Sequence, residues 1–189
     1  MYSSKNVYRR IGEMIRSGDI ANMLIKPTNF VLYIFAEECA NIVQLSVNAF
    51  FGIVLGIAFA GVIEITIIQA IFVIVAVILA VIIQILLQIL IGLIAFFTEE
   101  NKAFYLVLSK LQLLIILAPL EFYPTIMQKI FYFSPTTYSI YVPSKLLVHF
   151  DITKGFQLLG LEIIGFLIIV GVISVLYKKG VKKINVNGG

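Results

Sequence analysis

Two long runs without a charged residue constrain this chain more than any other feature. Residues 39–63 are uncharged and so are residues 65–98, with Glu64 alone between them. Each residue of an α-helix adds about 1.5 Å, so about 20 apolar residues cross a hydrocarbon core of about 30 Å. Either run is therefore long enough for a membrane-spanning helix. We predict an all-α integral membrane protein.

The composition and the rare reactive residues exclude most other classes. Hydrophobic residues make up 61% of the chain and charged residues 13%, whereas a soluble domain has about 25% charged residues. Cys39 is the only cysteine and His149 the only histidine, which excludes an internal disulfide and paired-histidine zinc sites. The sequence contains no GxxxxGK[ST] phosphate-binding loop. We therefore expect that this chain is not an enzyme and that it has no catalytic residue, no cofactor and no metal site.

Charged residues divide the apolar sequence into four predicted spans. These are roughly residues 42–63, 68–97, 103–120 and 156–177. Lys110 interrupts the third span and Glu162 the fourth. One charge at the bilayer centre costs about 2.5–3.5 kcal/mol, which the surrounding apolar residues offset. We expect both side chains to snorkel to an interface or to pair with a neighbouring helix.

The basic residues favour one orientation. Ten flank the predicted cytoplasmic ends of the spans and three lie on the other side: Lys5, Arg9, Arg10, Arg16, Lys26, Lys102, Lys178, Lys179, Lys182 and Lys183 against Lys129, Lys145 and Lys154. The positive-inside rule therefore places both termini in the cytoplasm. Anionic lipid and topology account for the net charge of +4, so we expect membrane lipid as a partner and no nucleic acid.

This orientation divides the chain into three parts. Residues 1–28 form a cytoplasmic amphipathic segment, residues 29–177 form the transmembrane domain, and residues 178–189 form a basic cytoplasmic tail. Residues 118–155 form an outer segment, which contains four of the five prolines and many aromatic residues. Aromatic residues of this kind are typical of a membrane interface.

The prolines of the outer segment predict short helices, because each proline limits helix continuation. We expect helices at about residues 125–133 and 136–142. Ser134 is the expected N-cap of the second helix, with Pro135 at its first helical position. The segment could serve as an interfacial anchor, as an outer gate to a substrate path, or as both.

Small and amide residues recur at every fourth position of the first two spans. Laid antiparallel, these spans match Gly52 and Gly56 with Ala80 and Ala76, as in close helix packing. The same alignment brings amide side chains together in the cytoplasmic half. One interpretation is helix packing alone. The other is a translocation path lined by Gln44, Asn48, Gln84, Gln88 and Gln112.

The cytoplasmic segment predicts two short helices. Val7, Ile11, Met14 and Ile15 share one helical face. Gly18 is a natural end for this helix, and Asp19 is the expected N-cap of a second helix that runs to about Leu24. Pro27 ends that helix, and Thr28 or Asn29 caps the next one. Such helices could lie on lipid or dock a soluble partner.

Three patterns in this order resemble a known family. They are RSGDIANMLIKPTN before the first span, FFTEENKAF after the second, and PLEFYPTIMQKIFYFSPTTYSIYVPSKLL before the last. The chain thereby resembles permease subunits of type-2 ATP-binding-cassette (ABC) exporters. Such permeases usually have six spans, so the resemblance implies that the first two are missing from this sequence.

The resemblance also implies partners and a docking segment. Permeases of this kind pair as homo- or heterodimers, bind two separate ATPase subunits, and dock each ATPase through a cytoplasmic coupling helix. By this comparison the ATPase-contact candidates are Arg9, Arg10, Glu13, Arg16, Gly18, Asp19, Leu24, Lys26 and Pro27. We expect a permease subunit, in the plasma (inner) membrane of a prokaryote, that moves a substrate outward by alternating access. The alternative is a channel-forming, holin-like or scaffolding membrane protein without an ATPase partner.

Overall fold

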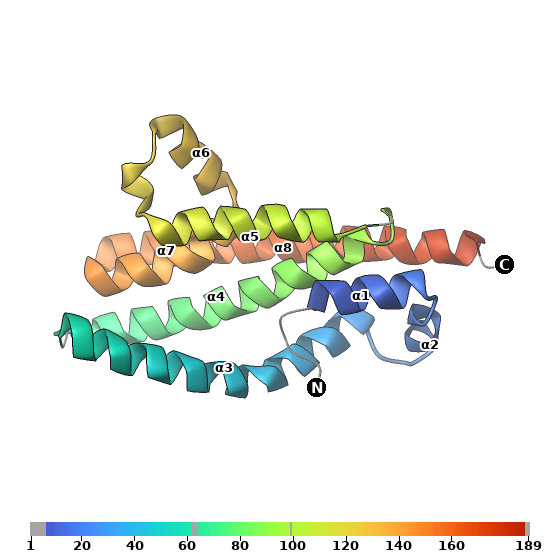
Figure 1. The fold of residues 1–189 in the computed structure, drawn as a ribbon, viewed down its shortest axis with the longest axis horizontal. Helices are drawn as coiled ribbons and strands as arrows, with labels where there is room; N and C mark the ends of the chain where they lie inside the picture. Colours follow the sequence, from blue (N-terminus) through green and yellow to red (C-terminus); the bar gives the residue numbers. More distant parts are fainter. Residues whose placement is uncertain (1–6, 62–63, 99, 188–189) are drawn as a thin grey trace.

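The computed structural model describes residues 7–61, 64–98 and 100–187, and it describes no side chain at residues 42–50, 52–53, 56–57, 60, 133 and 184–187. No strand occurs within these ranges, so the chain is all-α as predicted (Figure 1). The helices are α1 Val7–Arg16, α2 Ile20–Leu24, α3 Phe30–Ala60, α4 Ile67–Ile94, α5 Lys102–Leu117, the short 3₁₀-helix η2 Leu120–Phe122, α6 Thr125–Phe133, α7 Pro135–Val148 and α8 Ile152–Asn187.

Helix α4 is the central element of the bundle. It packs most extensively against α7 and α8, and its C-terminal half also packs against α1. The helices α1 and α2 lie at the same end of the bundle as the C-terminal end of α8, and the α3–α4 connection lies at the opposite end (Figure 1). The largest core cluster joins α4 to α8, with Ile83 and Leu93 of α4 beside Ile169 and Ile173 of α8.

Two helices within the described ranges are long and apolar enough to cross a membrane. They are Ile67–Ile94 and Ile152–Lys183, with mean hydropathies of 3.3 and 2.6, and they match the predicted second and fourth spans. Helix α5 has 16 residues, which makes it roughly 24 Å long and shorter than a hydrocarbon core of about 30 Å. Part of α3 lies outside the described side chains. The count of four spans stays a prediction.

Helix α3 starts well before the span that the uncharged run predicts. It begins at Phe30, not near residue 42, and so includes Glu37 and Glu38. Asn29 caps it, because its Oδ1 atom accepts hydrogen bonds from the backbone N–H groups of Val31 and Leu32, at 2.9 and 3.4 Å. The expectation of a cap at Thr28 or Asn29 is confirmed at Asn29.

The outer segment contains the two short helices that its prolines predict. Helix α6 spans the predicted residues, but α7 continues to Val148 with Pro143 inside it. It continues because Val142 and Leu146 are buried against α4, and this packing offsets the hydrogen bond that proline removes. Ser134 occupies the N-cap position of α7 and Pro135 its first helical position, as predicted, although the Ser134 side chain makes no capping hydrogen bond.

Ala76 of α4 packs against α7. It is fully buried in a cluster with Val142 and Leu146 of that helix. Gly52 and Gly56, its predicted partners in the first span, lie outside the described side chains, so that contact stays a prediction.

Candidate functional site

Helix α1 lies directly against the C-terminal end of α4. Val7 and Ile11 are buried there, and Met14 and Ile15 pack at the edge of the same core cluster, which confirms the predicted apolar face. A Cβ atom at Gly92 would lie 2.7 Å from the Cβ of Ile11. This approach is possible only because Gly92 has no side chain.

The start of α5 holds the other side of α1. The Nδ2 atom of Asn101 donates a hydrogen bond of 2.8 Å to the carbonyl oxygen of Tyr8. The ring of Tyr8 stacks on the ring of Tyr105, with the centroids 4.1 Å apart. Helix α1 is therefore fixed to α4 and α5 by apolar packing, a buried hydrogen bond and an aromatic stack.

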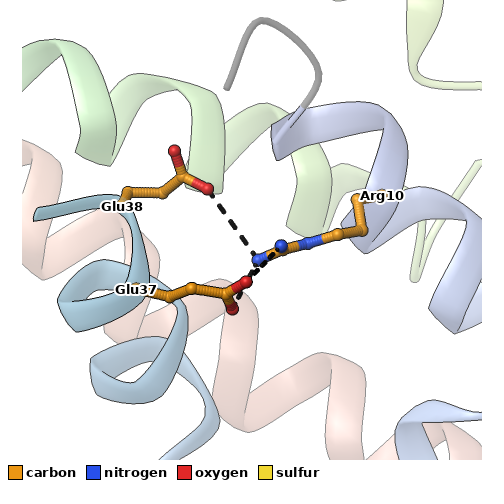
Figure 2. Close-up of polar contacts among 3 residues, drawn as sticks. All are labelled: Arg10, Glu37 and Glu38. Carbon is orange, nitrogen blue, oxygen red and sulfur yellow. Dashed lines mark hydrogen bonds and ion pairs between the residues drawn. The ribbon is translucent and has the colours of Figure 1, made fainter. Parts of the chain in front are cut away.

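An ionic cluster connects α1 to α3. The guanidinium of Arg10 donates two hydrogen bonds to the carboxylate of Glu37, at 2.6 and 2.9 Å, and lies 3.9 Å from the carboxylate of Glu38 (Figure 2). Arg10 and Glu38 are largely buried, with side-chain exposures of 24% and 6%. Two parallel hydrogen bonds fix direction as well as distance. This pairing explains how α3, which consists mostly of apolar residues, accommodates two adjacent glutamates.

Helix α2 turns away from α1 at Gly18. Gly18 has a φ of +82°, a left-handed conformation that favours glycine, so the predicted helix end is confirmed. Asp19 does not cap α2 through its side chain. Its carboxylate instead accepts a hydrogen bond of 2.6 Å from the hydroxyl of Ser17. The predicted N-cap position is therefore confirmed, but the side-chain capping bond is absent. The helix ends at Leu24, as expected, two residues before Lys26 and three before Pro27.

The predicted ATPase-contact residues divide into two groups. Seven are exposed at the surface of α1, α2 and their connections: Arg9, Glu13, Arg16, Gly18, Asp19, Lys26 and Pro27. Arg10 is engaged with Glu37, and Leu24 packs inward against the core cluster. The apolar side chain that projects outward here is Ile25, which is 83% exposed. Leu24 and Ile25 are adjacent, and a contact of Leu24 with an ATPase stays a prediction.

Two of the predicted amides meet in a polar cluster between α4, α5 and α7. Gln112 donates through Nε2 to the Oε1 atom of Gln84, at 2.8 Å, and to the hydroxyl of Thr136, at 2.9 Å. Gln84 donates in turn to the hydroxyl of Ser139, at 2.9 Å. We call these four side chains the amide–hydroxyl cluster. Each of the four side chains takes part in at least one hydrogen bond, as polar groups in an apolar surrounding require.

Gln88, another predicted path residue, takes no part in this cluster. Gln88 is one helical turn beyond Gln84, and its Oε1 atom is buried without a hydrogen-bond donor among the described residues. Gln44 and Asn48 lie outside the described side chains. Lys110, which we expected to snorkel or to pair, is exposed on α5.

Glu162 lies on the buried face of α8. Its side chain is 0% exposed, and neither carboxylate oxygen has a hydrogen-bond partner within the part of the chain that the structure describes. The expected snorkelling or pairing is therefore not what the structure has. The same buried face contains Gly155, Gly165 and Ile169, so Glu162 points toward the neighbouring helices.

The outer segment forms a cavity next to an ion pair. Lys145 lies 2.5 Å from Glu121, which also accepts a hydrogen bond of 2.9 Å from the hydroxyl of Tyr141. The hydrogen bond from Lys145 is the main reason why the pKa of Glu121 is lowered to about 2. A cavity of about 630 Å³ lies between these residues and the end of α5.

A family model whose description is "ABC-2 family transporter protein" matches residues 1–188. The chain belongs to the ABC-2 transporter family. No curated protein and no solved structure matches it. Proteins of this family are the membrane components of ABC transporters, so the predicted resemblance to an ABC-2 permease is confirmed and the place of this protein is in a membrane.

Several side chains that hold this ABC-2 permease together were missed by sequence reasoning. Glu37 and Glu38 were treated as the boundary before a span. Gln69 was not singled out, although its Nε2 atom donates to the carbonyl oxygens of Leu146 and Leu147, at 3.1 and 2.9 Å. These carbonyls lie at the C-terminal end of α7, where backbone acceptors lack partners within the helix. The sequence signal for this interaction was the position of Gln69, a polar residue in the first turn of an uncharged span.

Proposed function

We propose that this ABC-2 permease moves a substrate outward across the plasma membrane of a prokaryote by alternating access, driven by ATP hydrolysis on a separate subunit. The observation that carries the proposal is the rigid attachment of α1 and α2 to the long helices. Arg10 joins α1 to α3, and Ile11 joins α1 to α4 at Gly92. A displacement of this cytoplasmic element would therefore move both helices.

A surface for the ATPase lies on α2 and the residues that follow it. Ala21, Asn22, Ile25 and Lys26 are exposed, whereas Ile20 is fully buried beneath them. Ile25 provides an apolar anchor that projects from a short helix, and Lys26 adds a charge beside it. A short helix with one projecting apolar side chain suits a groove on a soluble partner.

The amide–hydroxyl cluster is the proposed polar part of the translocation path. It lies where α4, α5 and α7 meet, and it joins the central helix α4 to both of the others. Polar side chains in membrane helices are costly unless they have partners. Separation of α7 from α4 would release these donors and acceptors to a substrate.

A second permease subunit would complete the path. Among the residues of α5 only Ile115 is buried, and apolar side chains such as Val107 and Ile116 are exposed. A helix with one buried residue and a charged Lys110 needs a further partner, which we propose to be a second permease chain, with lipid against the remaining apolar faces. The alternative of a channel-forming, holin-like or scaffolding protein has no supporting observation, and membership of the ABC-2 family weighs against it.

Purification in mild detergent from the native host, followed by identification of the proteins that accompany the chain, tests the proposal. We expect an ABC ATPase to co-purify with the unmodified chain and to be lost from Ile25→Asp. The matched control is Ile126→Asp, since Ile126 is also an exposed isoleucine but lies in α6 of the outer segment. Equal recovery of the ATPase with both variants would assign α2 to the lipid surface.

A further inference from the structure

The buried carboxylate of Glu162 has no hydrogen-bond partner among the described residues. Helix α4 contains no charged residue, and Glu162 is the only charged residue from Gly155 to Tyr177 of α8. The single charged residue of α7 is Lys145, which pairs with Glu121. Burying an unpaired carboxylate in an apolar medium is costly. Ionisable residues within membrane helices mark substrate or ion pathways for this reason.

The packing of α8 shows which helices the face of Glu162 meets. Gly155 lies seven positions before it and Gly165 three positions after it, so the three residues share one helical face. A Cβ atom at Gly155 would lie 2.9 Å from the ring of Phe72 of α4 and 3.5 Å from Leu146 of α7, and one at Gly165 would lie 3.3 Å from Tyr138 of α7. This face of α8 therefore packs against both α4 and α7, and Glu162 lies on it between the two glycines.

The middle of α7 contains the hydroxyl part of the amide–hydroxyl cluster. Ser139 is one residue from Tyr138, and it is bonded to Gln84 of α4. Gln88 lies one turn further toward the C-terminal end of α4, and its Oε1 atom is another buried acceptor without a donor among the described residues. The interior thus offers a carboxylate and an amide oxygen that both lack donors. Such acceptors suit a ligand that carries N–H donors and a positive charge.

A cavity lies near the outer end of the bundle, and its lining includes residues of the α8 turns that precede Glu162. It has a volume of about 790 Å³ and lies between the end of α7 and the start of α8, where its lining extends as far as Leu161. Leu161 is the residue before Glu162. Separation of α7 from α8 would connect the cavity to the carboxylate, and the helix that must move contains Pro143, which weakens its hydrogen bonding.

We propose that Glu162 binds a positively charged amine of the transported molecule within the membrane. The substrate class is therefore an amphipathic cation, whose apolar part lies against the aliphatic walls of α4 and α8. This assignment rests on the proposed function, because it specifies what the permease moves. The amine assignment can be tested separately from the proposed function, because binding of the amine needs no ATPase.

Equilibrium binding to the purified full chain in mild detergent tests the assignment. The probe is dansylcadaverine, a fluorescent apolar group with a protonated primary amine, compared with its N-acetyl derivative, which has no charge. We expect saturable binding of the amine only, a loss of affinity of about tenfold or more in Glu162→Gln, and retention of binding in Glu162→Asp. The control Glu121→Gln removes a carboxylate of the outer segment and is expected to leave the affinity unchanged.

Three results would overturn the assignment: no saturable binding of the amine, equal binding of the acetylated probe, or unchanged affinity in Glu162→Gln. If Glu162→Gln does not fold, the chain with its natural sequence is treated with a hydrophobic carbodiimide, which reacts with carboxyl groups. The amine is expected to protect Glu162 from this reaction. Absence of protection overturns the proposal. Loss of this binding site while the ATPase still co-purifies refutes the amine assignment alone, whereas loss of the ATPase partner refutes the proposed function.

Discussion

Arg10 of α1 and Glu37 of α3 are joined by two hydrogen bonds, of 2.6 and 2.9 Å, although they lie 27 positions apart in the sequence (Figure 2). The pair fixes the orientation of α1 relative to α3. Because Glu38 is buried beside it, the arginine also compensates a second carboxylate. This arrangement gives Arg10 a structural role, and its predicted contact with an ATPase stays a prediction.

Arg10→Met is expected to destabilise the protein by about 1–3 kcal/mol, since it leaves two glutamates without their cation in a partly buried position. Thermal unfolding in detergent measures the change. The control is Arg9→Met, which breaks the pair with Glu13, whose side chains are 65% and 56% exposed. Exposed pairs of this spacing contribute about 0.3–0.5 kcal/mol. Equal effects of the two substitutions would contradict a stabilising role of the Arg10 pair.

Gly92→Ala is expected to destabilise the contact between α1 and α4 by about 1–3 kcal/mol, because the added Cβ atom would lie 2.7 Å from the Cβ of Ile11. The matched control is Gly160→Ala in α8, where nothing lies within 4 Å of the added atom. Alanine in a helix is favoured over glycine by about 0.5–1 kcal/mol, so this control should be neutral or stabilising. The prediction fails if Gly92→Ala raises the unfolding temperature as the control does.

The predicted topology is testable with single cysteines in a Cys39→Ser background. Lys129→Cys is expected to react with an impermeant thiol reagent on intact cells, because the positive-inside rule places residue 129 outside. Lys182→Cys is expected to react only after the membrane is permeabilised. Both positions are exposed in the structure, so access within the protein does not limit either reaction. The opposite labelling pattern would reverse the orientation.

Acid should weaken the outer segment through Glu121. Its folded-state pKa is lowered from 4.5 to about 2, first by the hydrogen bond from Lys145 and also by bonds from the backbone and Tyr141. A lowered carboxyl pKa contributes stability above the unfolded value, and this contribution is lost as the pH falls from about 4.5 toward 2.

Unfolding temperatures of the unmodified chain and of Glu121→Gln, measured from pH 6 to pH 3, test this sign. The unmodified chain is expected to be more stable at pH 6, and the difference should shrink as the pH falls. The difference will be modest, because both side chains of the pair are partly exposed and salt screens them. A difference that stays constant over this pH range would exclude the ionised Glu121 as its cause.

The short elements were predictable because their signals are local. Helix α6 lies between Pro124 and Pro135. The sequence predicts its bounds because each of these prolines limits helix continuation. Gly18 adopts a φ of +82° between α1 and α2, a conformation that glycine accepts at little cost. The apolar face of α1 and the membrane class follow in the same way, from the spacing and the number of apolar residues.

The tertiary structure decided which faces meet and which charges are compensated. Helix α3 begins at Phe30 and includes Glu37 and Glu38, which precede the uncharged run. Arg10, which is distant in the sequence, compensates these two carboxylates. Ala76 packs against α7, and Glu162 is buried without a partner among the described residues. Periodicity identifies the residues that share a helical face. It does not distinguish faces that contact other helices from faces that contact lipid, because both are apolar in a membrane protein. Only the packing of side-chain shapes in three dimensions determines which helix covers which face.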